Sequence, residues 1–191
     1  ISLVYQNPEE MFIKDSIHAD IAYAMQVRGI ADWQDRTRAL LERFRLTALQ
    51  DRDGRLMSGG QMRRASLAIG VALNPGILLL DEPTANLDIA TRKEIMRTLS
   101  DMKEVTDTVM IATHDMQLVC EWAERIIVLC QGQVAADGTR DEIFGNAALI
   151  SRVGIRPPEI FTMGQALDRR ALCYTVDEFL DAFSCEGRQE E

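Results

Sequence analysis

Hydrophobic residues along the chain occur in short continuous runs that are separated by segments with helical spacing. Four continuous runs, each bounded by turn residues, are typical of strands: 1–5, 77–80, 108–112 and 125–129. The uninterrupted aliphatic run 77–80 indicates a strand covered on both faces. Helical spacing appears between the runs, at about 20–27, 32–44 and 58–73. Strands that alternate with helices predict an α/β fold in which helices cover a parallel sheet.

The segment between the first two strands is predicted to be a helical insertion at about 7–57. Asn7-Pro8 releases the chain from the first strand, and Gly29 breaks the helical pattern. Asp32 is the predicted N-cap of the helix that follows. Asn74-Pro75-Gly76 ends the helix at 58–73 and returns the chain to the sheet.

The last part of the chain is predicted to form a hairpin and then short helices. Gln131-Gly132 is typical of a hairpin turn. Two capping boxes, Thr139 to Glu142 and Thr175 to Glu178, each predict the start of a helix. We therefore divide the chain into a domain at 1–146 and a helical extension at 147–191, which either extends a subunit interface or covers the domain's own core.

Composition narrows the class of protein. The chain has 21 basic and 30 acidic residues. The resulting net charge of −9 argues against nucleic acid or an anionic lipid surface as the main partner. No apolar run approaches the roughly 18 to 20 residues of a membrane span. The four cysteines have no metal-ligand spacing, which indicates reduced thiols in a cytoplasmic protein. The chain opens on Ile1, already inside a predicted strand, so we expect a fragment or a truncated copy.

Polar residues follow three of the predicted strands where each one ends. Asp81 and Glu82 follow the run 77–80, Gln6 follows the first strand, and His114 follows the run 108–112. In an α/β sheet the carboxyl ends of the strands face the ligand crevice. Taken alone, an acidic strand end is more often merely solvated, and a lone histidine there is more often structural.

A second candidate site is the start of the helix at 58–73, which reads Ser58-Gly59-Gly60-Gln61. Backbone N–H groups at a helix N-terminus carry partial positive charge and favour a phosphate, and glycines permit its close approach. The alternative is that Ser58 only caps the helix.

The order of these motifs resembles the nucleotide-binding domain of ATP-binding-cassette (ABC) ATPases. Met57 to Gln61 is similar to the family's signature motif, Ile77 to Glu82 to its Walker B strand and catalytic glutamate, and Ala85 to Asp88 to its D-loop. Gln6 matches the Q-loop glutamine and His114 the switch histidine. The resemblance implies a P-loop NTPase-like parallel sheet layered with helices.

The resemblance also implies a mechanism, in which ATP is hydrolysed between two such domains. Asp81 and Gln6 would hold Mg²⁺ through water, Glu82 would act on the attacking water, and His114 would contact the γ-phosphate. The signature residues Ser58, Gly59, Gly60 and Gln61 would bind the nucleotide of the other subunit, and Asp88 would belong to the D-loop.

Two short segments resemble the energy-coupling-factor ATPases of cobalt, nickel or vitamin uptake: Val4 to Glu9 and Val153 to Pro158. This implies an ATPase subunit at the cytoplasmic face of a membrane, with a second ATPase subunit, identical or different, and a transmembrane coupling subunit as partners. The alternatives are a non-transport ABC ATPase and a non-catalytic partner domain that donates the signature motif in trans.

The sequence departs from the family in one respect, because no lysine follows a glycine and the pattern G-x-x-x-x-G-K-[ST] is absent. In the family this loop precedes the Q-loop, so it would fall before Ile1. We expect the chain alone to bind ATP weakly and to be inactive. The resemblance also implies that the strand leading into this loop lies beside 77–80. Without that strand, 77–80 would have unpaired backbone groups.

Overall fold

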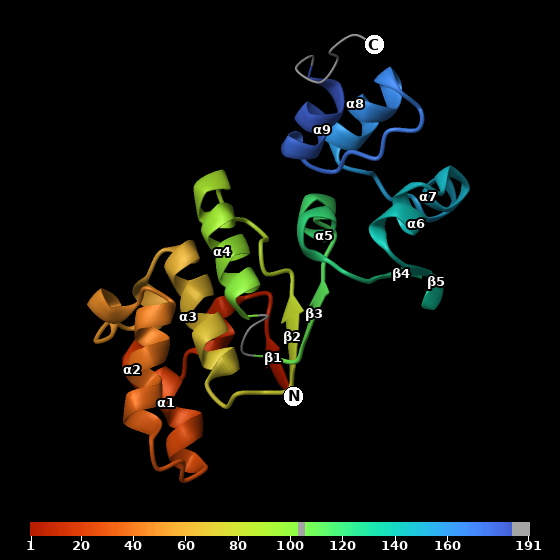
Figure 1. The fold of residues 1–191 in the computed structure, drawn as a ribbon. Coiled ribbons are helices and arrows are strands. Elements are labelled where there is room, and N and C mark those ends of the chain that lie inside the picture. The colour runs from red at the N-terminus through yellow and green to blue at the C-terminus, as the bar shows by residue number, and fades with distance from the viewer. Residues whose placement is uncertain (103–105, 185–191) are drawn as a thin grey trace. The chain divides into compact units, whose positions relative to one another are not determined.

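The computed structural model describes residues 1–102 and 106–184 (Figure 1). The chain forms two compact units, Ile1–His114 and Asp115–Glu191. This division lies earlier than the boundary at 146–147 predicted from the sequence, which falls inside the second unit. Among the described residues no helix is both long enough and apolar enough to cross a membrane.

The first unit is built on a parallel sheet of three strands, β1 (Ser2–Val4), β2 (Ile77–Asp81) and β3 (Thr108–Ala112). The strand order is β1-β2-β3, so β2 is the central strand (Figure 1). The α/β class and these three strands are confirmed. The expectation that 77–80 has an unpaired edge is wrong, because both of its edges are paired, one with β1 and the other with β3.

Burial alternates along β2, where the sequence predicted cover on both faces. Leu78 and Leu80 are buried, whereas Ile77 is 38% exposed. The cause is helix α3 (Gly59–Val71), which packs closely on one face of the sheet. A Cβ atom at Gly70 would come within 2.5 Å of Val4 Cγ2, so the glycine allows this approach.

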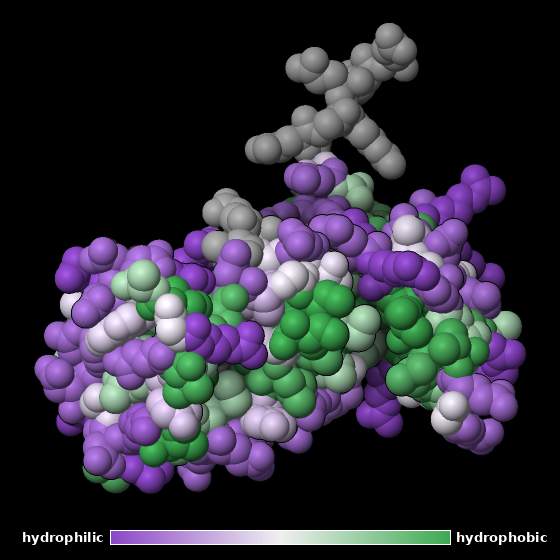
Figure 2. Space-filling model, turned by 90° about the horizontal axis from the view of Figure 1, so that it is seen from below, coloured by the Kyte–Doolittle hydropathy of each residue, from purple (hydrophilic) through white to green (hydrophobic). Residues whose placement is uncertain are grey.

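Residues on the other face of this sheet are more exposed. Leu3, Leu79 and Met110 occupy matching positions on the three strands, and Met110 is 55% exposed. Figure 2 shows one side of the molecule, where hydrophobic residues gather in patches between hydrophilic ones.

The helical insertion holds two α-helices and three 3₁₀ turns: η1 (Pro8–Met11), α1 (Ile17–Val27), α2 (Trp33–Arg43), η2 (Thr47–Leu49) and η3 (Gly54–Leu56). Its core is formed by residues that are almost completely buried: Ile17, Ile21, Met25 and Leu41. Gly29 follows the C-terminal end of α1 and has a φ of 66°. Asp32 does occupy the N-cap position of α2, but its side chain makes no capping hydrogen bond. Its own backbone is the reason, because φ −94° and ψ 21° lie outside the extended conformation that usual N-caps adopt.

Helix α4 (Ile89–Met102) connects β2 to β3 in the first unit.

The second unit contains a β-hairpin and five helices among its described residues: α5 (Met116–Trp122), β4 (Ile126–Cys130), β5 (Gln133–Gly138), α6 (Arg140–Phe144), α7 (Ala147–Val153), α8 (Glu159–Leu167) and α9 (Val176–Phe183). The predicted turn is confirmed, since Gln131 and Gly132 both have positive φ, as a type I′ hairpin requires. Both predicted capping boxes are present.

Candidate functional site at the carboxyl end of the sheet

Three parallel strands carry the predicted site residues to one edge of the sheet. Val4 lies beside Leu80, and Asp81 lies beside Ala112. Because parallel strands end at the same edge, Gln6, Asp81 with Glu82, and His114 follow three adjacent strand ends. Strands β1, β2 and β3, which are far apart in the sequence, therefore lie side by side (Figure 1).

Glu82 is held against the end of β3 by both its backbone and its side chain. Its backbone N–H donates to the carbonyl of Ala112 at 2.9 Å. Carboxylate Oε2 accepts from Thr113 Oγ1 at 2.8 Å, and Oε1 accepts from the backbone N–H of His114 at 3.0 Å. Glu82 has a φ of 44°, a left-handed conformation that costs a non-glycine residue energy and is enriched at functional sites.

Glu82 also contacts the imidazole of His114, whose Nδ1 lies 2.5 Å from Glu82 Oε1. An ionised carboxylate only accepts hydrogen bonds, so it pairs with the His114 tautomer that carries its proton on Nδ1. The Glu82 side chain is 15% exposed, whereas that of His114 is 87% exposed. The pair thus presents an oriented imidazole to solvent above a mostly buried carboxylate.

Asp81 is exposed at the end of β2. Among the described residues no group of three or more His, Cys, Asp or Glu side chains could hold a metal ion. The single exposed carboxylate of Asp81 is compatible with Mg²⁺, which keeps several waters and is held by one or two protein groups together with substrate phosphates.

The signature segment forms an exposed helix N-terminus. Ser58 Oγ accepts from the Gln61 N–H at 3.4 Å, and Gln61 Oε1 accepts from the Ser58 N–H at 3.1 Å. Ser58 is therefore a cap, as the alternative interpretation proposed. The first turn contains no acidic residue, so the positive end of α3 is not neutralised within its own turn.

Asp88 caps the next helix, α4, and has a local structural role of its own. Its Oδ1 accepts from the N–H groups of Ala90 and Thr91, both at 3.0 Å, and its Oδ2 accepts from Thr91 Oγ1 at 2.6 Å. The hydroxyl of Thr91 is the main reason that the pKa of Asp88 is lowered, so the carboxylate is charged at neutral pH.

Comparison with known proteins agrees with this arrangement of motifs. The ABC transporter family model matches residues 1–85. The energy-coupling factor transporter ATP-binding protein EcfA of Methanothermobacter thermautotrophicus is 34% identical over 160 residues, which cover 83% of this chain and 51% of that protein. EcfA1 of Lacticaseibacillus paracasei is 34% identical over 180 residues, or 93% of this chain and 64% of that protein.

A solved structure, that of cbiO1 from Clostridium perfringens, has 30% sequence identity and a TM-score of 0.68, and the match covers 83% of this chain and 64% of that one. The chain belongs to the ABC transporter ATPase family. It spans about half to two thirds of the length of these relatives.

Two residues that contact the motifs of this ABC ATPase were not found by sequence reasoning. Arg63 is buried on α3, and its guanidinium donates to the backbone carbonyls of Tyr5 and Gln6. Thr91 lies against Gly60, where a Cβ atom would come within 2.3 Å of Thr91 Cγ2. A signal for Arg63 was present, because it lies four residues before the buried Leu67 and therefore on the apolar side of the helix.

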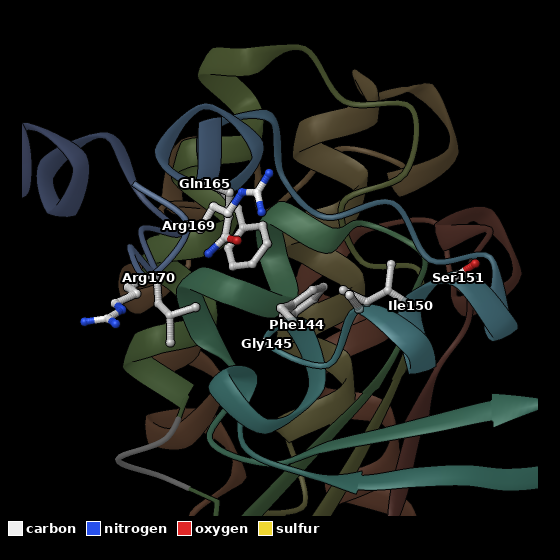
Figure 3. A pocket seen from close by; sticks show the side chains of 10 residues that line it. Phe144, Gly145, Ile150, Ser151, Gln165, Arg169 and Arg170 are labelled. Atoms are coloured by element: carbon white, nitrogen blue, oxygen red, sulfur yellow. The ribbon is translucent and has the colours of Figure 1, made fainter. Parts of the chain in front are cut away.

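A pocket of about 520 Å³ lies in the second unit of the ABC ATPase chain. Phe144 and Ile150 contribute to its apolar lining, with Gln165 and Arg169 beside it and Arg170 extending away (Figure 3). None of the predicted site residues lines this pocket, so it is separate from the chemistry of the motifs.

Proposed function

We propose that this chain is part of an ATP-hydrolysing subunit that energises a membrane transporter, with import of a metal ion or vitamin as its task. The observation that most strongly supports this proposal is the Glu82–His114 pair at the ends of adjacent parallel strands. The relatives support transport, since two are named as ATP-binding proteins of energy-coupling factor transporters and cbiO1 is described as part of the ABC transporter complex cbiONQ.

Glu82 acts as the general base in this proposal. Its Oε1 already accepts two hydrogen bonds from His114, whereas Oε2 accepts one from Thr113. A carboxylate oxygen can accept two hydrogen bonds, so Oε2 has room for the attacking water while His114 and Thr113 keep the group oriented. His114, exposed above it, contacts the γ-phosphate.

Asp81 and Gln6 would hold the Mg²⁺ of Mg-ATP through water. The bound ion neutralises phosphate charge and helps to orient the nucleotide. The protein groups have separate roles. Asp81 and Gln6 fix the position of the metal ion, whereas Glu82 removes a proton from the attacking water.

The exposed N-terminus of α3 binds the nucleotide held by a second ATPase subunit, identical or different. The capping box engages the N–H groups of Ser58 and Gln61. Within the segment from Ser58 to Gln61, Gly59 and Gly60 therefore offer their backbone N–H groups to the γ-phosphate in trans, and Asp88 belongs to the same interface. A transmembrane coupling subunit is the further partner, so the ATPase lies at the cytoplasmic face of the membrane.

The substitution Glu82→Gln in the protein assembled with its transporter partners tests this function. An amide keeps the shape of the side chain but cannot accept the proton, so ATP binding persists while turnover falls by about 10²- to 10⁴-fold. The measurements are steady-state phosphate release and equilibrium binding of ATP. Phosphate release within about twofold of wild type, or about 0.4 kcal/mol of barrier, contradicts the proposal.

A further inference from the structure

Two consecutive arginines of α3 make different contacts. Arg64 forms an ion pair at 2.5 Å with Glu94 of the neighbouring helix α4, and its side chain is 14% exposed. Arg63 is 3% exposed and reaches the segment that follows β1. The two residues have the same chemistry and adjacent positions, so they form a natural pair for comparison.

The contacts of Arg63 are made to backbone carbonyls. Nη1 donates to the Tyr5 carbonyl at 3.1 Å and Nη2 to the Gln6 carbonyl at 2.7 Å. Among the described residues, no hydrogen-bond partner meets the buried Nε. Burial lowers the pKa of Arg63 and the charge of Asp81 opposes this, but a guanidinium remains protonated in proteins.

A buried charge with neutral acceptors is costly, and an apolar side chain could fill the same space. What an apolar side chain could not do is hold two successive carbonyls at once, which the planar fork of a guanidinium does. Arg63 therefore fixes the backbone at Gln6 to the helix that begins at the signature residue Ser58.

The far end of the same segment is attached to the stretch just before the signature motif. Phe12 is 5% exposed and packs on Gly54, where a Cβ atom would come within 2.5 Å of its ring. The Lys14 carbonyl accepts from Arg55 at 3.5 Å. The segment from Gln6 to Lys14 is thus held at both ends by the stretch that carries Ser58.

We propose that Arg63 is a positioning residue that couples the Q-loop to the signature motif. A displacement of Gln6 by the nucleotide of its own subunit is transmitted through Arg63 to α3, and so to the nucleotide that Ser58 contacts in the partner subunit. This inference rests on the proposed function and names a residue through which the two nucleotide sites communicate.

The test compares Arg63→Met with Arg64→Met in the protein assembled with its transporter partners. Hydrogen exchange of the amides at 6–12 should become faster in Arg63→Met and stay unchanged in Arg64→Met. Turnover should fall about tenfold, or about 1.4 kcal/mol of barrier, in Arg63→Met alone, while the KM for ATP stays within about twofold. A merely structural residue would lower stability without this separation of kcat from KM.

Arg63→Lys keeps the charge and covers the case in which Arg63→Met fails to fold. The lysine ammonium lacks the planar fork of a guanidinium. Hydrogen exchange at 6–12 and turnover in Arg63→Lys should therefore lie between those of wild type and Arg63→Met. Unchanged exchange at 6–12 in the Arg63 variants, or equal effects of the Arg63 and Arg64 substitutions, overturns the proposal. Wild-type protein without ATPase activity would refute the proposed function, whereas the exchange measurement would still decide whether Arg63 positions the segment.

Discussion

Within the described part of the chain, three helices begin with a capping box, and the boxes differ in charge. In α6 and α9 the box pairs a threonine with a glutamate, Thr139 with Glu142 and Thr175 with Glu178. In α3 it pairs Ser58 with the neutral Gln61. The backbone hydrogen bonds are equivalent, so the boxes satisfy the same local requirement.

The difference lies in what each helix end can still bind. Helix α6 carries Asp141 and Glu142 in its first turn, and α9 carries Asp177 and Glu178. These carboxylates complement the positive end of their own helix. The first turn of α3 has two glycines and an amide instead, so its positive end is available to an anion from another molecule. The comparison teaches that a helix end can be capped and still bind a ligand. The charge of the first turn distinguishes the helix end that can bind an anion from the two that cannot.

The largest expected effect comes from blocking the open helix end with Ser58→Arg. A long side chain there prevents the approach of the partner subunit's γ-phosphate, so turnover should fall by at least about 10²-fold. A nucleotide analogue should still bind each separate subunit. Thr139→Arg is the control in α6 and should leave turnover unchanged. Equal loss of analogue binding and turnover in Ser58→Arg would count against a role in trans.

The next effect comes from Gln61→Glu, which gives α3 the charge of the other two helices. The capping hydrogen bonds can persist, so the melting temperature should stay the same or rise slightly. The added negative charge repels phosphate, and turnover should fall by about tenfold, or about 1.4 kcal/mol. The reverse exchange in α6, Glu142→Gln, should not affect turnover. Normal turnover in Gln61→Glu would show that the charge of the first turn is unimportant.

A third prediction separates the two glycines of the open helix end. A Cβ atom at Gly59 meets nothing within 4 Å, whereas one at Gly60 would collide with Thr91 Cγ2. Gly60→Ala should therefore lower the free energy of unfolding by about 1 to 3 kcal/mol, whereas Gly59→Ala should leave it unchanged or raise it slightly. Thr91→Ser removes the methyl group and keeps the hydroxyl. Combined with Gly60→Ala in a double variant, it should therefore restore much of the lost free energy of unfolding. Denaturant unfolding of the four variants measures this, and failure of Thr91→Ser to rescue would contradict the assigned contact.

Features that depend on neighbours within about four residues were predictable from the sequence. The boxes at Thr139 and Thr175 and the turn at Gln131-Gly132 follow from short-range hydrogen bonds and backbone preferences, and all are present. Asp32 shows the limit of this reasoning, since it occupies the cap position while its backbone conformation keeps the carboxylate from capping.

Features that depend on distant residues were not predictable. Arg63 binds carbonyls 57 and 58 positions away, and no local pattern shows where a buried guanidinium will reach. The central place of β2 likewise depends on which strands pair, and the prediction of an unpaired edge was wrong for that reason. The candidate site was predicted as separate strand ends, whereas the direct contact of Glu82 with His114 required the structure.

The smallest expected effect is a difference in how the boxes respond to acid. The backbone N–H of Thr139, followed by its hydroxyl, lowers the pKa of Glu142 below its ordinary value of 4.5. A lowered folded-state pKa means that this group stabilises the fold above its ordinary pKa, and that the contribution is lost as the pH falls through the lowered value. Gln61 does not titrate, so the box of α3 keeps its hydrogen bonds in acid. The melting temperature of wild type should therefore exceed that of Glu142→Gln at pH 7, and the gap should narrow toward pH 3. A gap that stays constant over this range would show that the charge of Glu142 does not stabilise α6.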